Sequence, residues 1–386
     1  MKVVFTGAAG GHFYPLIAIA EALEEIVLER KLVTPQLYYL SDKPNDEQTL
    51  FASNLTFIRI PAGKMRRYFS LKNVSDMFVT LQGFFVALVT LFRIYPDVVV
   101  SKGSYASVPV VLAAHLLRIP IIIHESDAEP GRANILASKM ATRIAIAYDS
   151  SIQFFPVKAR ANIARVGIPI RKQLRTLPSA QEGQQEFQLD PSIPTILVLG
   201  GSSGSERIND TLLDTLPDVL SFANVIHQTG KKNISAVEAR SKVVLTGSPY
   251  APRYHALAYL SAESLSRAAA SATLVVSRAG ATSISEISLW QKPSILIPIP
   301  ESVSHDQRTN AYAYAHTGAA VVLEEANLTS HVLASEIRRI STNPSEAQTM
   351  SAYATGFSNP EAARVIAEEI VRIGLSHEPP TSAPVV

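Results

Sequence analysis

The chain has 386 residues, of which 47% are hydrophobic, and it contains no cysteine. Disulfides, thiolate metal sites and a thiol nucleophile are therefore excluded, and the length favours two domains. Residues 1–165 hold 18 Lys and Arg against 13 Asp and Glu, a net charge of +5, whereas residues 166–386 hold 17 against 20, a net charge of −3. A basic first half suits an anionic partner surface, although ordinary charge scatter explains the imbalance equally well.

Short apolar runs alternate with amphipathic helical patterns along most of the chain. This alternation predicts parallel sheets that are covered by helices on both faces. The first run starts at Lys2, so we expect no signal peptide before it. The predicted strands are Val3–Thr6, Leu37–Leu40, Phe57–Ile60, Val98–Ser101, Ile121–His124, Arg143–Ala147, Thr195–Leu199, Asn224–Gln228, Val243–Thr246, Leu274–Ser277 and Ser294–Ile297.

Two stretches share one pattern, in which a buried strand is followed by a glycine-rich turn and a helix. They are VVFTGAAGG in the first half and ILVLGGSSG in the second. The repeated pattern predicts an α/β protein with two Rossmann-like, doubly wound parallel-sheet domains. We expect an N-terminal domain, a C-terminal domain, a helix that packs back on the N-terminal domain, and a disordered tail, at residues 1–165, 166–350, 351–375 and 376–386.

The first glycine loop ends in a histidine at the predicted start of a helix. Gly7, Gly10 and Gly11 lack the G-x-G-x-x-G spacing of dinucleotide-binding loops, although Asp42 follows the second strand, where a ribose-binding acid would lie. A nicotinamide-dependent oxidoreductase therefore stays an alternative. His12 either satisfies its own helix end or acts as a general base at the ligand-binding edge of the sheet, because imidazole has a pKa near neutrality.

Three loops of the second half suit a nucleotide sugar. Residues 200–204, GGSSG, offer small side chains and amides at a helix start, a pattern that cradles phosphate. In SRAGATSISEI, residues 277–287, Glu286 either binds ribose hydroxyls or caps its helix. HDQRTNA, residues 305–311, either binds sugar hydroxyls or is an ordinary polar loop. No metal-binding motif accompanies them, so we expect no bound metal.

The most apolar stretch, Ser75–Pro96, is surrounded by basic residues. Its apolar part, Met77–Phe92, is shorter than the ~20 residues of a membrane-spanning helix. We expect a helix with one face buried on the first sheet and the other face on an anionic membrane surface. The basic residues around it are Lys64, Arg66, Arg67, Lys72 and Arg93.

Eight motifs in a fixed order give the chain a family resemblance over residues 1–372. They are GAAGGHFYP, SKGSYASVPVVLAA, IIHESDAEPGRAN, VGIPIR, LGGSSGSERIN, IHQTGK, SRAGATSISEI and HDQRTNA. With these motifs the chain resembles the MurG family of peptidoglycan glycosyltransferases, which belongs to glycosyltransferase family 28. The resemblance implies a GT-B fold, in which two Rossmann-like domains face a central cleft. The first domain would take a lipid acceptor and the second a UDP-sugar.

The activity implied by the resemblance is an inverting transfer of N-acetylglucosamine from UDP-N-acetylglucosamine. The acceptor is the C4 hydroxyl of the N-acetylmuramyl-pentapeptide carried on undecaprenyl pyrophosphate, so that lipid I becomes lipid II. The resemblance implies no metal or other cofactor and no nucleic-acid partner. It places the enzyme at the cytoplasmic face of the plasma membrane, bound peripherally through the Ser75–Pro96 region.

Individual residues are also assigned by the resemblance. It implies His12 as the general base, assisted by Glu125. The implied acceptor-binding residues are Gly10, Gly11, Tyr105, Asp127 and Asn134. The implied UDP-sugar-binding residues are Arg171, Ser202, Gly204, Asn209, Arg278, Ala281, Thr282, Glu286 and Gln307.

Departures from the family pattern lie mostly on the acceptor side. Ala8-Ala9 stands where the family has a Gly-Thr pair, and Ser126-Asp127 stands where it has Gln-Asn. Asp127 adds a negative charge beside a diphosphate, which is unfavourable unless a base pairs with it. A related enzyme for another lipid, a UDP-N-acetylglucosamine 2-epimerase and an inactive membrane scaffold therefore stay alternatives. Intact His12, Glu286 and Gln307 favour an active enzyme over the scaffold.

Overall fold

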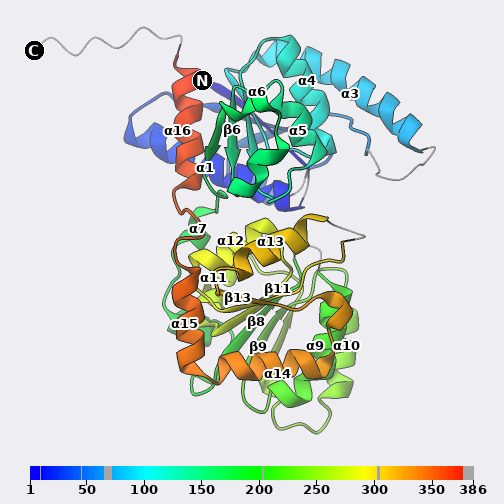
Figure 1. The fold of residues 1–386 in the computed structure, drawn as a ribbon, viewed down its shortest axis with the longest axis vertical. Helices are drawn as coiled ribbons and strands as arrows, with labels where there is room; N and C mark the ends of the chain where they lie inside the picture. The colour runs from blue at the N-terminus through cyan, green and yellow to red at the C-terminus, as the bar shows by residue number, and fades with distance from the viewer. Residues whose placement is uncertain (9, 45, 65–71, 202–203, 302–304, 377–386) are drawn as a thin grey trace, which may run out of the picture. The chain divides into compact units, whose positions relative to one another are not determined.

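The computed structural model describes residues 1–386 except 9, 45, 65–71, 202–203, 302–304 and 377–386. The chain divides into two compact units, which we call the N-terminal unit (Met1–Arg171 with Glu361–Val386) and the C-terminal unit (Lys172–Pro360). Figure 1 shows both, coloured along the chain. The sequence placed the first boundary a few residues earlier, after residue 165. The predicted disordered tail lies outside the described residues, apart from Ser376.

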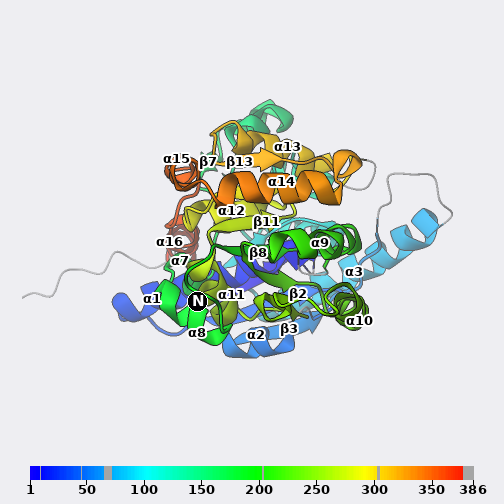
Figure 2. The same ribbon diagram turned by 90° about the horizontal axis from the view of Figure 1, so that it is seen from below.

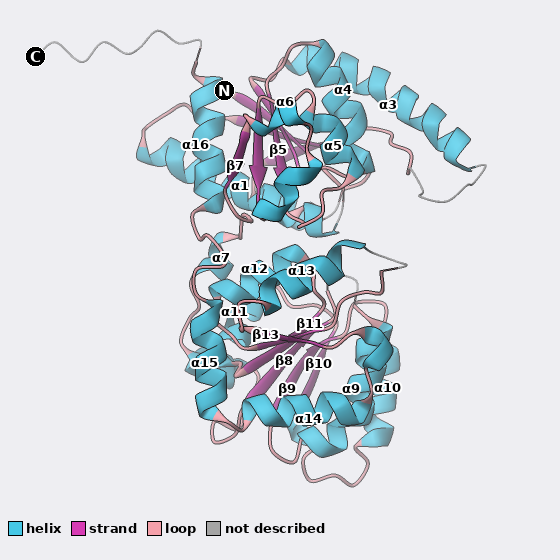
Figure 3. Cartoon of the chain, viewed as in Figure 1, coloured by secondary structure: helices cyan, strands magenta, loops and turns pink. Residues whose placement is uncertain are grey.

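The N-terminal unit is built on a parallel sheet with the strand order β3-β2-β1-β4-β5-β6-β7. Figure 3 shows its strands between helices. The strands are β1 Lys2–Thr6, β2 Gln36–Ser41, β3 Leu55–Arg59, β4 Val98–Ser101, β5 Ile121–Glu125, β6 Arg143–Ile146 and β7 Ile163–Arg165. The α-helices are α1 Tyr14–Glu29, α2 Glu47–Ala52, α3 Lys72–Ile94, α4 Val108–Leu116, α5 Arg132–Ser138, α6 Val157–Arg160 and α16 Ala362–Gly374, with 3-10 turns at η1 Gly10–His12, η2 Tyr105–Ser107 and η3 Asp149–Phe154.

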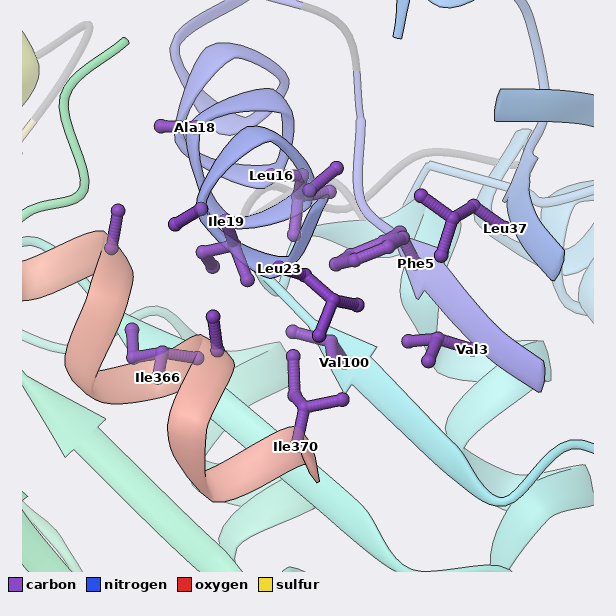
Figure 4. Close-up of a cluster of buried hydrophobic side chains, with 14 of the residues drawn as sticks. Val3, Phe5, Leu16, Ala18, Ile19, Leu23, Leu37, Val100, Ile366 and Ile370 are labelled. Atoms are coloured by element: carbon purple, nitrogen blue, oxygen red, sulfur yellow. The ribbon is translucent and has the colours of Figure 1, made fainter. Parts of the chain in front are cut away.

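Strand β1 shows how the N-terminal unit fills both faces of its sheet. Because side chains alternate along a strand, Val3 and Phe5 join one core with α1 and α16, whereas Val4 joins another with α3 and α4. In Figure 4, Ile366 and Ile370 of α16 lie beside side chains of α1 and β4. A helix from the end of the chain therefore completes the core that the start of the chain begins.

The C-terminal unit has a second parallel sheet, with the order β10-β9-β8-β11-β12-β13. Helices α9 and α14 pack against one face and lie side by side (Figure 2). The strands are β8 Thr195–Leu199, β9 Asn224–Gln228, β10 Tyr254–Leu257, β11 Leu274–Ser277, β12 Ser294–Leu296 and β13 Ala320–Val322. The α-helices are α7 Lys172–Arg175, α8 Ala180–Glu186, α9 Glu206–Val219, α10 Ile234–Val244, α11 Ala262–Ser271, α12 Ala281–Leu289, α13 His305–Ala315, α14 Ser330–Ser341 and α15 Pro344–Ala354, with 3-10 turns at η4 Ala251–Arg253 and η5 Glu325–Asn327.

Two predicted elements differ from the structure. The run Val243–Thr246 is not a strand, because α10 continues to Val244 and the side chain of Val243 is 75% exposed. The helix expected over 351–375 is two helices, α15 in the C-terminal unit and α16 in the N-terminal unit. Pro360 lies between them, and proline is compatible with a helix start but interrupts a helix interior.

Helix α3 is longer than the apolar run that predicted it. It spans Lys72–Ile94, and within the described chain it is the one helix long and apolar enough to cross a membrane by length and composition. Only 17% of its most apolar stretch of 18 residues is buried, and Ala87 and Leu91 form part of the buried face. The exposed apolar side chains are Val74, Met77, Phe78, Val79, Leu81, Phe85, Val89 and Phe92.

Candidate active site

The order of strands in the N-terminal sheet marks where a ligand should bind. From β1 the chain adds β2 and β3 on one side of the sheet, and from β4 it adds β5, β6 and β7 on the other. In such sheets ligands bind at the carboxyl ends of the strands, where the winding reverses. The loops after β1 and β4 carry His12 and Lys102, and Glu125 is the last residue of β5, so the three residues lie at this edge.

His12 ends the short turn η1 directly before α1. Its Nδ1 atom is buried and has no hydrogen-bond partner among the described residues. Burial, and then the positive charge of Lys102, lower the pKa of His12 from 6.5 to about 4, while Asp127 acts in the opposite direction. The imidazole is therefore neutral at physiological pH and able to accept a proton. Gly10 has a φ of 82°, a conformation that glycine adopts without strain.

Glu125 holds the loop that follows β5. Its Oε1 accepts a hydrogen bond from the backbone N–H of Asp127 at 2.9 Å, and its Oε2 accepts from Gly131 N at 3.1 Å and Asn134 Nδ2 at 2.9 Å. Burial and the charge of Asp127 raise the pKa of Glu125 to about 7. Both oxygens are thus engaged with the loop and with α5, and the loop's shape depends on this carboxyl group.

Lys102 is a site residue that the sequence motifs did not single out. It directly follows β4, is 1% exposed, and donates from Nζ to Ser126 Oγ at 2.7 Å. Burial lowers the pKa of Lys102, and the negative charges of Glu125 and Asp127 oppose that shift. Asp127 was expected to need a basic partner, because its negative charge is unfavourable beside a diphosphate. Lys102 is the basic residue that interacts with it. The signal available in the sequence was a lysine placed directly after a wholly apolar strand.

Tyr105 and Arg171 are held by aromatic and polar contacts. The Tyr105 hydroxyl donates to Asp42 Oδ2 at 2.8 Å, and the Lys64 ammonium lies 5.5 Å from the centre of the Tyr105 ring. Burial and the Asp42 carboxylate raise the pKa of Tyr105. Asp42 is thus engaged with Tyr105, which weakens the case for a ribose-binding acid at this position. The Arg171 guanidinium stacks 4.2 Å from the Tyr14 ring centre, so it lies in the N-terminal unit.

The C-terminal sheet reverses its winding between β8 and β11. The second glycine loop follows β8, although Ser202 lies outside the described residues. Gly204 has a φ of 77°, and a Cβ atom there would overlap the carbonyl oxygen of Thr229. Ser205 then caps α9, because its Oγ accepts a hydrogen bond from Ile208 N. The loop therefore ends at the N-terminus of α9, the place in which a phosphate cradle is built.

Asn209 lies in a buried network behind this loop. Its Nδ2 donates to Thr229 O at 3.0 Å, and its Oδ1 lies 3.0 Å from His227 Nε2. His227 Nδ1 lies 2.8 Å from the Tyr254 hydroxyl, and burial lowers the pKa of His227 to about 3. Asn209 is 2% exposed. Its amide therefore supports the loops at the ends of β8 and β9.

Arg278, which follows β11, is committed to protein partners. Its Nη2 donates to Ser205 Oγ at 2.7 Å and forms an ion pair with Glu325 at 2.6 Å. Its Nη1 donates to Ile297 O at 3.2 Å and Pro298 O at 3.3 Å. The guanidinium therefore joins the loops after β8, β11, β12 and β13 at one edge of the sheet.

The remaining donor-side residues lie on the two helices after β11 and β12. Ala281 and Thr282 are the first two residues of α12, whose N-cap is Gly280, and Glu286 on the same helix is 8% exposed. Gln307 on α13 accepts a hydrogen bond at Oε1 from Ile299 N at 3.2 Å. Among the described residues, no group of three His, Cys, Asp or Glu is placed to hold a metal ion.

Both halves of the chain match models of one enzyme family. The glycosyltransferase family 28 N-terminal domain matches residues 3–146, and the C-terminal domain of that family matches residues 195–369. The chain belongs to glycosyltransferase family 28. This membership confirms the resemblance drawn from the motifs and makes the chain a glycosyltransferase.

Curated relatives of the chain carry one name. A Lachnospira eligens protein is 35% identical over 342 residues, which cover 88% of this chain and 90% of the relative. A Treponema denticola protein is 34% identical and covers 83% of each. Both are named UDP-N-acetylglucosamine--N-acetylmuramyl-(pentapeptide) pyrophosphoryl-undecaprenol N-acetylglucosamine transferase.

Solved structures confirm the GT-B fold. Acinetobacter baumannii MurG has a TM-score of 0.70 at 23% identity and covers 96% of this chain and 99% of its own. The UDP-GlcNAc 2-epimerase from Neisseria meningitidis, bound to UDP-GlcNAc, has a TM-score of 0.67 at 14% identity and covers 96% and 100%. A transferase and an epimerase thus share this architecture, and the fold alone does not choose between them.

Proposed function

We propose that this family 28 enzyme transfers N-acetylglucosamine from UDP-N-acetylglucosamine to the C4 hydroxyl of N-acetylmuramyl-pentapeptide on undecaprenyl pyrophosphate, converting lipid I to lipid II for peptidoglycan. The observation that carries the proposal is the relatives' name, shared at 35% identity over nearly nine tenths of the chain. The neutral imidazole of His12 at the edge of the N-terminal sheet, whose Nδ1 has no hydrogen-bond partner among the described residues, supports it. The N-terminal unit binds the acceptor, and the C-terminal unit binds the UDP-sugar.

The chemistry is an inverting displacement at the anomeric carbon. The acceptor oxygen forms a bond to that carbon from the face opposite UDP, the bond from the carbon to the β-phosphate oxygen breaks, and its electron pair leaves with UDP. His12 takes the proton of the attacking hydroxyl as general base. The N-termini of α9 and α12 stabilise the negative charge that grows on the departing diphosphate.

The assigned residues divide between the two substrates. Around the acceptor, Glu125 acts by holding the 125–131 loop rather than by contacting His12, and Asn209 and Arg278 have the same supporting role on the donor side. The acceptor residues are Gly10, Gly11, Tyr105, Asp127 and Asn134. The donor residues are Arg171, Ser202, Gly204, Ala281, Thr282, Glu286 and Gln307, with Glu286 on the ribose hydroxyls and Gln307 on the sugar.

A lipid acceptor requires access to a membrane surface, and α3 supplies it in this proposal. Most of its exposed apolar side chains, from Val74 to Phe92, recur at helical spacing and share one face, whereas Val79 lies off that face. Lys64 and Arg93 are exposed, and Arg93 lies in the last turn of α3, while Arg66 and Arg67 lie outside the described residues. The helix lies on the cytoplasmic face of the plasma membrane and binds anionic lipid peripherally.

The membrane proposal is tested with vesicles. Phe78→Ser with Phe85→Ser should reduce co-sedimentation with phosphatidylglycerol vesicles, and Val157→Ser, a change at an exposed apolar residue of α6, should not. The wild-type chain should bind phosphatidylcholine vesicles more weakly. Equal binding of all three proteins would remove α3 from the membrane contact.

The transfer itself is tested with radiolabelled UDP-N-acetylglucosamine and a short-chain lipid I analogue. Transfer should fall ~100-fold or more in His12→Ala, the loss typical of a general base. His115→Ala, at an exposed histidine of α4, is the matched control and should keep full transfer. Conversion of UDP-N-acetylglucosamine to its C2 epimer, without transfer to the analogue, would instead identify the 2-epimerase that shares the fold.

A further inference from the structure

We propose that Lys102 is a further acceptor-binding residue, whose buried ammonium binds the diphosphate of the lipid acceptor. The proposal rests on the proposed function, because it takes the acceptor to be a diphosphate-linked lipid. It adds to the N-terminal site a residue that lies in the motif SKGSYASVPVVLAA but was given no role from the sequence.

The place of Lys102 in the sheet favours a ligand contact. It is the first residue after β4, and β4 pairs with β1 at the point where the winding reverses. Its backbone N–H donates to Thr6 O at 2.9 Å, and its Cβ would lie 3.2 Å from a Cβ built on Gly7. The lysine stem therefore runs alongside the first glycine loop, at the edge where such sheets bind ligands.

The ammonium group has hydrogen-bonding capacity that the described residues leave unused. An ammonium carries three N–H donors, and Lys102 Nζ has one hydrogen-bond partner among those residues, Ser126 Oγ at 2.7 Å. Buried ammonium groups are normally fully paired, because leaving their donors unpaired is costly. A lysine held only for packing would therefore be poorly satisfied here, whereas a bound phosphate oxygen would complete its bonds.

Neighbouring polar atoms at the same edge are also without partners. Within the described residues, His12 Nδ1, Ser104 Oγ and Asn134 Oδ1 are buried and make no hydrogen bond. A Cβ on Gly103 would lie 2.7 Å from Asn134 Oδ1, so the Asn134 amide lies directly against the loop that Lys102 begins. The unpaired atoms come from the loops after β1 and β4 and from α5, which follows β5, and these segments meet at the ligand-binding edge.

Charged groups of both signs surround Lys102. Glu125 and Asp127 are the acids that act on its ammonium, and His12 and His124 are the bases whose charged forms it disfavours. Because the pKa of Glu125 is raised to about 7, one of the two acids is half protonated near neutrality. Lys102 then offsets Asp127, and the edge admits a diphosphate that Asp127 alone would repel.

Binding of a simple diphosphate tests the proposal separately from catalysis. Calorimetry would measure geranyl diphosphate binding to the full chain, with saturating UDP present to occupy the donor site. Lys102→Met should weaken binding at least ~10-fold, as expected for a charge-assisted hydrogen bond. Lys158→Met, at an exposed lysine of α6, should leave it unchanged. Ser126→Ala keeps the charge of Lys102 but removes the hydrogen bond that holds its ammonium group, and should weaken binding by a smaller factor.

A second ligand separates a direct contact from a structural role. With geranyl monophosphate, the Lys102→Met factor should shrink, whereas a merely distorted site would lose both ligands equally. If Lys102→Met does not fold, Ser126→Ala carries the same comparison. Equal diphosphate affinity in wild type and variant, or no binding to the wild type at millimolar ligand, would overturn the assignment. A wild-type chain that binds the diphosphate yet transfers no sugar would refute the proposed function, while Lys102 would still be a diphosphate-binding residue.

Discussion

Lys102 and Arg278 occupy equivalent places in the two sheets. Lys102 directly follows β4, which pairs with β1, and Arg278 directly follows β11, which pairs with β8. Both are buried, and both donate to a serine hydroxyl on a neighbouring loop. Arg278 also binds two carbonyl oxygens and Glu325, whereas Lys102 Nζ bonds only to Ser126 among the described residues. One position in the fold thus holds a structural cation in one unit and, in our proposal, a ligand-binding cation in the other.

The largest difference should appear in stability. Arg278→Met should cost about 2–4 kcal/mol of unfolding free energy, because it removes one partner of a largely buried ion pair and leaves the Glu325 carboxylate unpaired. Lys102→Met should cost less, since Glu125 is able to take up a proton when the cation is gone. Urea unfolding of both variants beside the wild type would measure this. Equal losses would mean that Lys102 is as structural as Arg278.

The glycine loops should differ in the same direction. Gly204→Ala should cost about 2–3 kcal/mol, because Gly204 has a positive φ and an added Cβ would overlap the Thr229 carbonyl. Gly11→Ala should stay within ~1 kcal/mol, because a Cβ on Gly11 meets nothing within 4 Å. Thermal melts of the two variants compare the loops directly. A larger loss in Gly11→Ala would contradict the view that the C-terminal loop is the more tightly packed.

The smallest effect should come from Glu125→Gln, and it should depend on pH. The variant loses a carboxylate hydrogen bond, at a cost of about 1 kcal/mol. The pKa of Glu125 is about 7 in the folded chain against an ordinary 4.5, so folding favours the protonated form. The wild type therefore loses stability as the pH rises from 4.5 through 7, and the neutral glutamine does not.

The deficit of Glu125→Gln should accordingly be larger at pH 5 than at pH 8. Urea unfolding at the two pH values would measure it, with Glu47→Gln, a change at an exposed residue of α2, as the control. A deficit that grows toward pH 8 would mean that Glu125 is held as a carboxylate, and that Lys102 is its committed partner.

The strands that carry the site could be predicted from the sequence because they are short, mostly apolar and have a glycine within three residues of their ends. Val98–Ser101, Thr195–Leu199 and Leu274–Ser277 have the predicted bounds. The strands β7 and β10 were not predicted, because their residues are mostly half-buried or exposed and give no continuous apolar run. Strand β13 was also not predicted, although its residues, Ala320–Val322, are apolar. Val243–Thr246 is apolar but ends a helix, since local composition does not distinguish the two.

The roles of polar residues depend on partners far along the chain. Asn209 contacts His227 and Thr229, which come from β9 and the loop after it, and Arg278 contacts Glu325 beyond β13. Lys102 contacts Ser126 after β5. Motif spacing identifies the loop on which a residue lies. Whether its side chain faces a ligand or a neighbouring loop is decided by the pairing of strands, which the motifs do not contain.

Helix α16 has a consequence for how the chain is made. A ribosome synthesises the N-terminal sheet first, and α1 covers part of the face that carries Val3 and Phe5, but the core on this face is complete only when Ile366 and Ile370 emerge. The C-terminal unit, by contrast, is one continuous segment, Lys172–Pro360. Domains usually complete their folding in the order of synthesis. Here the first unit to be translated is the last to be completed, so the part of its apolar core that α16 covers stays open for almost the whole time of synthesis.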